Sequence, residues 1–182
     1  MAKAIGMLEV NSMARGIYIA DAMVKVADVD IVTSSPTCPG KYIVIVHGDV
    51  AAVETSVRHG ESTAKEYYVD SIIIPNVHPE VFPAITGTTA PAEISAVGIM
   101  ESFSMASMVI MADVVLKAAE LYAIELRLGN GMGGKALFVF TGDVAAVEAG
   151  IEAGKKAATD QCLMVNSEII PSPSSILIPS LL

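Results

Sequence analysis

The chain has 182 residues, of which 53% are hydrophobic, 17% are charged and 5% are aromatic, and its formal net charge is −9. Phosphate binding by counterion release needs a cluster of Lys and Arg, and the sequence has none, so nucleic acid is disfavoured and we expect no nucleic-acid partner. Small domains have too much surface to hide such an apolar share alone. The mean hydropathy of +0.58 therefore favours burial between subunits.

Charge-free stretches fall short of a membrane span. The longest of them, residues 169–182, is interrupted by Pro171, Pro173 and Pro179, whereas a spanning helix needs about 20 apolar residues. The N-terminus has neither the apolar region nor the cleavage site of a signal peptide. We expect a cytoplasmic protein that has no membrane partner.

The first half of the chain predicts the order strand, helix, strand, strand, helix, strand, which is the split-βαβ, ferredoxin-like arrangement of an α+β fold. The elements are expected at residues 4–10, 12–27, 30–34, 42–46, 49–65 and 69–74, with a short helical turn at 80–85. Ser12 and Asp49 are the expected helix N-caps. The apolar stripes that we expect on the two helices are Met13, Ile17, Ala20, Val24 and Ala27, and Val50, Val53 and Val57.

The same pattern then occurs a second time. The segment A-I-G-M-L-E at 4–9 returns as A-V-G-I-M-E at 96–101, and G-D-V-A-A-V-E at 48–54 returns unchanged at 142–148. Such internal similarity indicates a duplicated structural unit. We therefore expect two domains, at 1–88 and 94–182, joined near residues 86–93.

Residues 129–135 have the spacing G-x-x-x-x-G-K of a phosphate-binding loop. That chemistry needs a Ser or Thr after the Lys and a helix that begins at the loop. Here Ala136 follows the Lys, and the next residues predict a strand. The aligned segment of the first copy, 38–41, also enters a strand, so nucleotide binding is disfavoured.

Cys38 lies in a turn between two predicted strands and is flanked by Pro36 and Pro39. Such a thiol is either incidental or a metal or redox group, and one thiol cannot hold a cluster by itself. If three chains met at this turn, three thiolates would converge on one axis. The aligned residue of the second copy is Met132, and Cys162 is expected to fill the core.

The remaining polar residues do not form a recognisable catalytic set. His47, His59 and His78 lack partners at metal-ligand spacing, and no acid–base pair stands out, so we expect no enzyme activity. Glu9 and Glu101 each end a first strand and suit a satisfied polar group at a strand–helix corner. In the first helix of each copy, one lysine follows an Asp by four residues: Lys25 and Lys117. Each lysine is expected to form either an ion pair with that Asp or an edge contact between neighbouring assemblies.

Three motifs resemble the bacterial microcompartment domain: A-[IV]-G-x-x-E, D-x-x-x-K in the first helix and G-D-V-A-A-V-E after the third strand. Two such domains in one chain are similar to the tandem, trimer-forming class of microcompartment shell proteins. Residues 1–41, with the turn C-P-G-K, are most similar to the shell proteins of propanediol-utilisation compartments.

The resemblance implies a homotrimer with a pseudohexagonal outline that tiles a microcompartment shell in the cytoplasm beside other shell proteins. It implies that Cys38 of three chains holds one 4Fe-4S cluster in a central pore and passes electrons across the shell or to an encapsulated redox enzyme. The implied pore residues are Pro36, Thr37, Cys38, Pro39, Gly40, Gly131, Met132 and Gly133. At the tile edge it implies Lys25 and Lys117, with His78 in place of an Arg that the family often has after the last strand.

Two other functions remain open on the sequence. One is a metal-free pore that gates metabolites, in which Cys38 only shapes the opening. The other is a ferredoxin-like trimer that senses a small molecule in clefts between subunits, which the failed phosphate motif at 129–135 disfavours.

Overall fold

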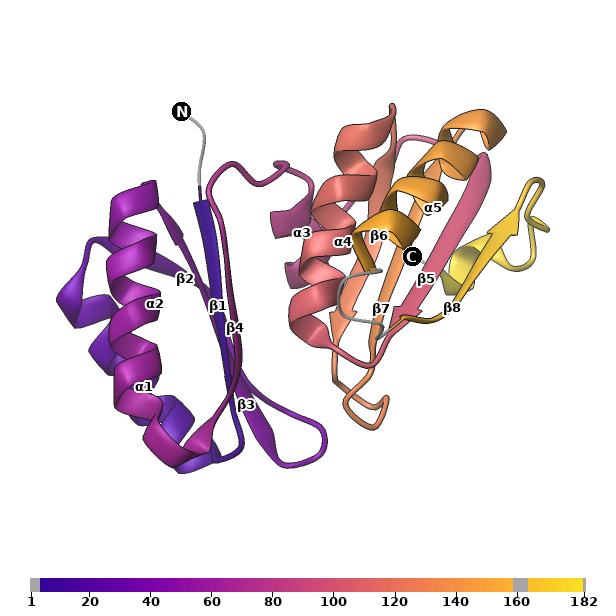
Figure 1. The fold of residues 1–182 in the computed structure, drawn as a ribbon. Helices are drawn as coiled ribbons and strands as arrows, with labels where there is room; N and C mark the ends of the chain where they lie inside the picture. The colour runs from indigo at the N-terminus through magenta and orange to yellow at the C-terminus, as the bar shows by residue number, and fades with distance from the viewer. Residues whose placement is uncertain (1–3, 159–163, 182) are drawn as a thin grey trace. The chain divides into compact units, whose positions relative to one another are not determined.

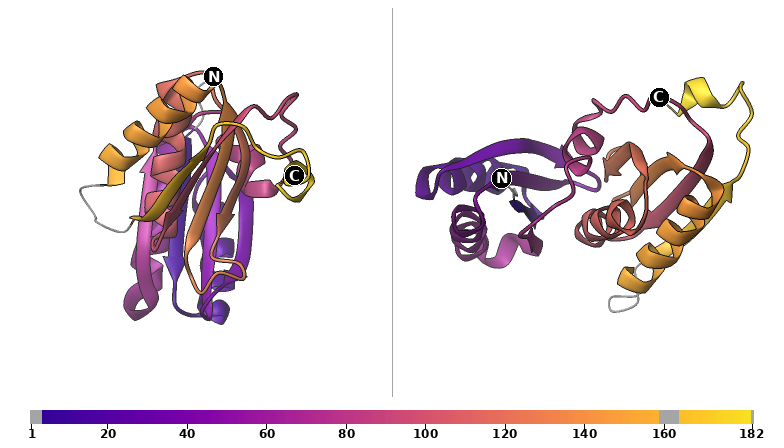
Figure 2. Two further views of the ribbon diagram at one scale, coloured as in Figure 1. Left: turned by 90° about the vertical axis from the view of Figure 1, so that its right-hand side faces the viewer. Right: turned by 90° about the horizontal axis from the view of Figure 1, so that it is seen from above.

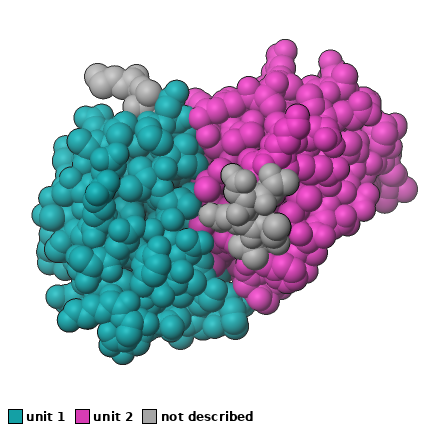
Figure 3. Space-filling model, in the orientation of Figure 1, with its two compact units in different colours: residues 1–77 teal, residues 78–182 magenta. Residues whose placement is uncertain are grey.

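The computed structural model describes residues 4–158 and 164–181, and the chain forms two compact units, residues 1–77 and 78–182 (Figure 3). In each unit, two helices pack on one face of a four-stranded antiparallel sheet (Figures 1 and 2). The two-copy architecture expected from the internal repeat is therefore confirmed. No helix within these described ranges is long and apolar enough to cross a bilayer.

Unit 1 has the strand order β2-β3-β1-β4, which is the order of the split-βαβ fold. Its elements are β1 (Ala4–Val10), α1 (Met13–Val26), β2 (Val29–Thr37), β3 (Lys41–Gly48), α2 (Val50–Ala64), a 3-10 turn (Lys65–Tyr67) and β4 (Tyr68–Ile74). The expected α+β fold class is thus confirmed. Strand β2 lies at one edge of the sheet and pairs only with β3.

Unit 2 repeats this topology with the order β6-β7-β5-β8. Its elements are α3 (Val81–Thr86), β5 (Ala96–Ser102), α4 (Met105–Ala118), β6 (Tyr122–Leu128), β7 (Ala136–Gly142), α5 (Val144–Ala158), β8 (Met164–Ile170) and a 3-10 turn (Ile178–Ser180). Helix α3 packs beside the edge strand β6. It therefore belongs to unit 2, although the sequence placed it within the first domain at 1–88.

Helix α1 turns a different side to the core than the sequence predicted. Ser12 caps it as expected, because its side chain accepts a hydrogen bond from the Arg15 amide. The buried residues are Gly16, Ile19, Ala20 and Met23, whereas Met13 is 51% and Ile17 60% exposed. The predicted stripe was wrong for those two because α1 is apolar on more than one side. In α2, Val53 and Val57 are buried as expected, but Val50 is 37% exposed.

The two cores fill one equivalent space in opposite ways. In unit 1, Gly16 of α1 lies against Tyr42 of β3, and a β-carbon added at Gly16 would overlap the Tyr42 ring. The repeat aligns Gly16 with Met108 and Tyr42 with Ala136, both fully buried in unit 2. A large strand residue faces a small helix residue in one copy, and the sizes are exchanged in the other. Each copy thus combines one large and one small side chain at these two positions, and volume-conserving exchanges are the ones that close-packed interiors tolerate best.

This exchange predicts strong coupling between the two positions. Gly16→Met should lower the free energy of unfolding by about 2–3 kcal/mol, because the side chain has no room beside Tyr42. The double variant Gly16→Met/Tyr42→Ala should lose at least ~1 kcal/mol less than the sum of the two single changes. Denaturant unfolding at one protein concentration measures all three variants. Strict additivity would contradict a shared space.

Candidate functional site

Cys38 lies at the tip of the hairpin that joins β2 to β3. The turn has only three residues, 38–40, because β2 and β3 pair as far as Thr37 and Lys41. Cys38 is a free, partly exposed cysteine, and Pro39 and Gly40 are exposed. Gly40 has φ +74°, a left-handed conformation that glycine adopts at little cost. The sequence expectation of an exposed, conformationally restricted thiol therefore agrees with the turn geometry.

Two of the predicted turn residues are strand residues instead. Pro36 and Thr37 end β2, opposite Tyr42 and Lys41 of β3, and Thr37 is buried. The proline suggested a loop because it lacks an N–H, but an edge strand accepts proline where the missing donor would face away from the sheet. The pairing thus leaves Cys38 at the start of a short turn rather than inside a long loop.

The corresponding loop of unit 2, between β6 and β7, is longer and glycine-rich. Gly131 and Gly133 have φ +73° and +62°, and a Cβ at either would meet no atom within 4 Å. The Gly129 amide donates to the Lys135 carbonyl at 3.0 Å and closes the loop. Met132 is partly exposed in it. This loop presents a thioether where the first copy presents a thiol, and the role of either loop in a pore stays a prediction.

An ion pair beneath each hairpin explains the lysine of the apparent phosphate motif. Lys41 Nζ lies 2.6 Å from Glu9 Oε1, and the Glu9 side chain is only 4% exposed. In the second copy Lys135 pairs with Glu101. Both glutamates lie on the central strand of their sheet. The lysines therefore satisfy carboxylates at the strand–helix corner, and the expectation for Glu9 and Glu101 is confirmed. Sequence analysis missed the partners, although their recurrence in both copies was a usable signal.

The predicted tile-edge residues form ion pairs within their own helices. Lys25 Nζ lies 2.6 Å from Asp21 Oδ2, and Lys117 Nζ lies 2.7 Å from Asp113 Oδ2. Asp113 also accepts a 2.7 Å hydrogen bond from the backbone N–H of His78. Of the three predicted tile-edge residues, Lys117 and His78 therefore lie close together, because both contact Asp113. The ion-pair interpretation is confirmed for both lysines, and their contact with a neighbouring assembly stays a prediction.

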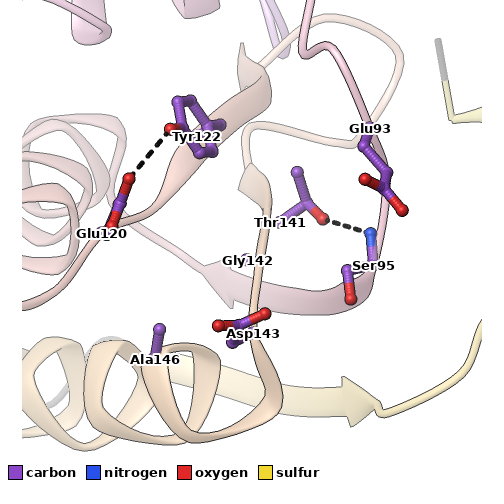
Figure 4. Close-up of a pocket in the computed structure, with 8 residues that line it drawn as sticks. All are labelled: Glu93, Ser95, Glu120, Tyr122, Thr141, Gly142, Asp143 and Ala146. Carbon is purple, nitrogen blue, oxygen red and sulfur yellow. Dashed lines mark hydrogen bonds between the residues drawn. The ribbon is translucent and has the colours of Figure 1, made fainter.

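Unit 2 has an acidic hollow of about 250 Å³ that the sequence did not reveal (Figure 4). Its residues come from three separate segments: Glu93, Ser95, Glu120, Tyr122, Thr141, Gly142, Asp143 and Ala146. The negative charge of Glu120, whose carboxylate accepts a 3.3 Å hydrogen bond from the phenol, raises the pKa of Tyr122 above its ordinary value. The hollow is open, and it contains no Lys, Arg or His to balance its carboxylates.

The described residues of one chain do not form a complete metal site. Among residues 4–158 and 164–181 there is no group of three or more His, Cys, Asp and Glu side chains that could hold an ion. Cys38 offers one sulfur per chain at a partly exposed tip. Cys162, expected to be core filler, lies outside the described residues.

Comparison with known proteins identifies the class. Residues 4–77 and 96–173 each match the model of the BMC domain. The chain therefore belongs to the BMC-domain family of bacterial microcompartment proteins, with two copies of the domain in tandem.

Relatives that match nearly the whole chain indicate which type of BMC-domain protein this is. The bacterial microcompartment shell protein PduT of Citrobacter freundii is 38% identical over 173 residues, which are 95% of this chain and 94% of PduT. A microcompartment protein from Desulfitobacterium hafniense DCB, known from its crystal structure, is 46% identical with a TM-score of 0.94, covering 98% of this chain and 99% of that one. The carboxysome assembly protein CcmO of Synechococcus elongatus is 26% identical over 99% of this chain and 69% of CcmO. The chain is a tandem BMC-domain protein of the PduT type.

The Glu9–Lys41 pair predicts a large difference between two lysine substitutions. Lys41→Met leaves the buried Glu9 carboxylate without its cation and should lower the free energy of unfolding by about 2–3 kcal/mol. The control is Lys25→Met, which breaks a pair that is 71% and 57% exposed and should cost about 0.5 kcal/mol or less. Denaturant unfolding compares them. Equal losses would contradict a structural role for Lys41.

The acidic hollow predicts a shift in one tyrosine titration. Glu120→Gln removes the charge beside the phenol, so the pKa of Tyr122 should fall toward its ordinary value. Absorbance of the tyrosinate form as pH rises measures this shift, and Tyr122→Phe identifies the step that belongs to this residue. Glu93→Gln, on the rim of the same hollow, is the control and should leave the titration unchanged. An unchanged pKa in Glu120→Gln would contradict the cause given above.

Proposed function

We propose that three copies of this chain form a pseudohexagonal disc in a bacterial microcompartment shell and that Cys38 of each chain supplies one thiolate to a shared 4Fe-4S cluster. The single observation that carries the proposal is the position of Cys38, at the partly exposed tip of a three-residue turn in one copy only. Similarity to PduT over nearly the whole of both chains supports the shell assignment.

The chemistry of the donor set fits a cluster shared between chains. Thiolates are the usual ligands of iron–sulfur clusters, and a single chain brings only this one in its described parts. A threefold axis at the turn would gather three sulfurs and leave one iron without a protein ligand. When bound, such a cluster would accept and release one electron at a time. The chain's own part would be to hold the sulfurs at the end of a paired hairpin, which the Glu9–Lys41 pair anchors to the sheet.

The second copy supports the same arrangement from its own loop. Its loop carries Met132 and four glycines with positive φ, at 129, 131, 133 and 134. A thioether binds iron–sulfur clusters far less readily than a thiolate, so a trimer would present three ligands and not six. Duplication of the domain permits this difference, because each copy can change its loop independently. The proposed partners are other shell proteins, which would contact Lys25, Lys117 and His78, and a redox enzyme inside the compartment.

The test is purification of the full chain without oxygen, followed by measurement of mass, iron and acid-labile sulfide. We expect a trimer with about four iron atoms, visible light absorption that bleaches on reduction, and a paramagnetic signal in one redox state. Cys38→Ser should abolish all of these without changing the trimer mass, and Cys162→Ala should retain them. An iron-free trimer would instead favour the metal-free pore that gates metabolites, and a monomer would contradict the disc.

A further inference from the structure

The segment that follows the last strand of each copy lies in different surroundings in the two halves of the chain. The repeat I-I-P at 73–75 and 169–171 aligns residues 78–86 with residues 174–182. This alignment matches Val81 with Leu177 and Pro83 with Pro179. Val81 is fully buried, whereas Ile176 is 88% and Leu177 is 37% exposed. The second segment thus repeats apolar positions of the first but leaves them uncovered.

The first segment covers one side of unit 2. The carboxylate of Glu80 accepts a hydrogen bond from the backbone N–H of Ala123 at 3.3 Å, and the hydroxyl of Thr89 donates to the carbonyl of Ile124. Both bonded groups belong to the edge strand β6, and helix α3 packs against this strand. The His78 N–H binds Asp113 of α4 at 2.7 Å. An edge strand that would otherwise offer free backbone groups to other chains is closed by these contacts.

The equivalent side of unit 1 is open. Ile31 of β2 pairs with Val46, as Ala123 of β6 pairs with Phe140, so Ile31 and Ala123 hold the same place in their sheets. Ala123 is 1% exposed and Ile31 is 44% exposed. The Asp21 side chain is 57% exposed, whereas that of its counterpart Asp113 is 8% exposed. We call this surface, formed by Ile17, Tyr18, Asp21 and Ile31, the open strip.

We propose that residues 174–181 of one chain cover the open strip of a second copy of the same chain, as residues 78–89 cover α4 and β6 within the chain. The proposal rests on the proposed trimer and assigns its contact. The residue changes support it: Glu80, which meets Ala123 through a polar contact, aligns with Ile176, and Ala123 aligns with Ile31. A polar contact in one copy corresponds to two exposed isoleucines in the other.

The segment and the open strip are different surfaces, on the second and first halves of the chain. An interface between different patches is heterologous: it repeats from chain to chain and gives either a closed ring or an open filament, and the proposed trimer is the closed ring. Leu181 packs against the cluster of Val97, Ile124 and Val139 in unit 2, which keeps the end of the segment on its own unit. Ile176 and Leu177 are thus held on unit 2 with their side chains exposed, available to a neighbour.

The test is a disulfide between two differently tagged chains that are expressed together, with Cys38→Ser and Cys162→Ala in both. One chain carries Ile31→Cys and the other Ile176→Cys. Under mild oxidation we expect a linked product that carries both tags. The control replaces Ile176→Cys by Val165→Cys, which lies on β8 outside the segment and is 38% exposed, and we expect no link from it.

A second measurement uses the trimer itself. Leu177→Asp should raise the concentration at which the trimer dissociates about tenfold or more, because an apolar contact is replaced by a buried charge. Phe103→Asp, at a residue that is 64% exposed and outside both surfaces, should leave that concentration unchanged. A trimer that persists with neither the link nor the shift would overturn this contact while leaving the disc intact. A monomeric unmodified protein would overturn both.

Discussion

The ion pair between the central strand and the hairpin lysine is the interaction on which the candidate site depends. Glu9 lies on β1, between β3 and β4, and its carboxylate is almost fully buried. Burial of a carboxylate without a partner is costly, and Lys41, which pairs with it, is the first residue after the turn that carries Cys38. The pair therefore holds the start of β3 against the end of β1. Because β3 begins there, the turn is short and the thiol stands at its tip.

The equivalent ion pair of the second copy shows why a motif with the spacing of a phosphate-binding loop can have a different role. In the second copy, G-x-x-x-x-G-K ends on Lys135, which neutralises Glu101 and is followed directly by β7. A phosphate loop needs backbone N–H groups at the start of a helix, and a strand offers none in that direction. The glycines serve the turn, where four of them have positive φ. Local context decides between the two meanings of one spacing.

Much of the fold could be predicted because its signals are local and occur twice. β1 begins and ends where its apolar run does, and Ser12 caps α1 as its position suggests. Contacts between distant parts of the chain were harder to predict. Periodicity alone did not indicate which apolar side of α1 faces the core, since Ile17 and Ile19 are equally hydrophobic and only Ile19 is buried. The Glu9–Lys41 pair joins residues 32 positions apart, and the acidic hollow joins three segments.

The high apolar share of the composition and the wrong prediction of the buried side of α1 have one physical cause. A helix that is apolar on two sides can bury only one of them within a small domain. In unit 1 the second side, with Ile17 at 60% exposure, adjoins an edge strand whose Ile31 is also exposed. In unit 2 the chain's own segment 78–89 closes the corresponding edge. A duplicated chain thus covers one of two equivalent surfaces by itself and leaves the other exposed, and the proposed contact between chains depends on that asymmetry.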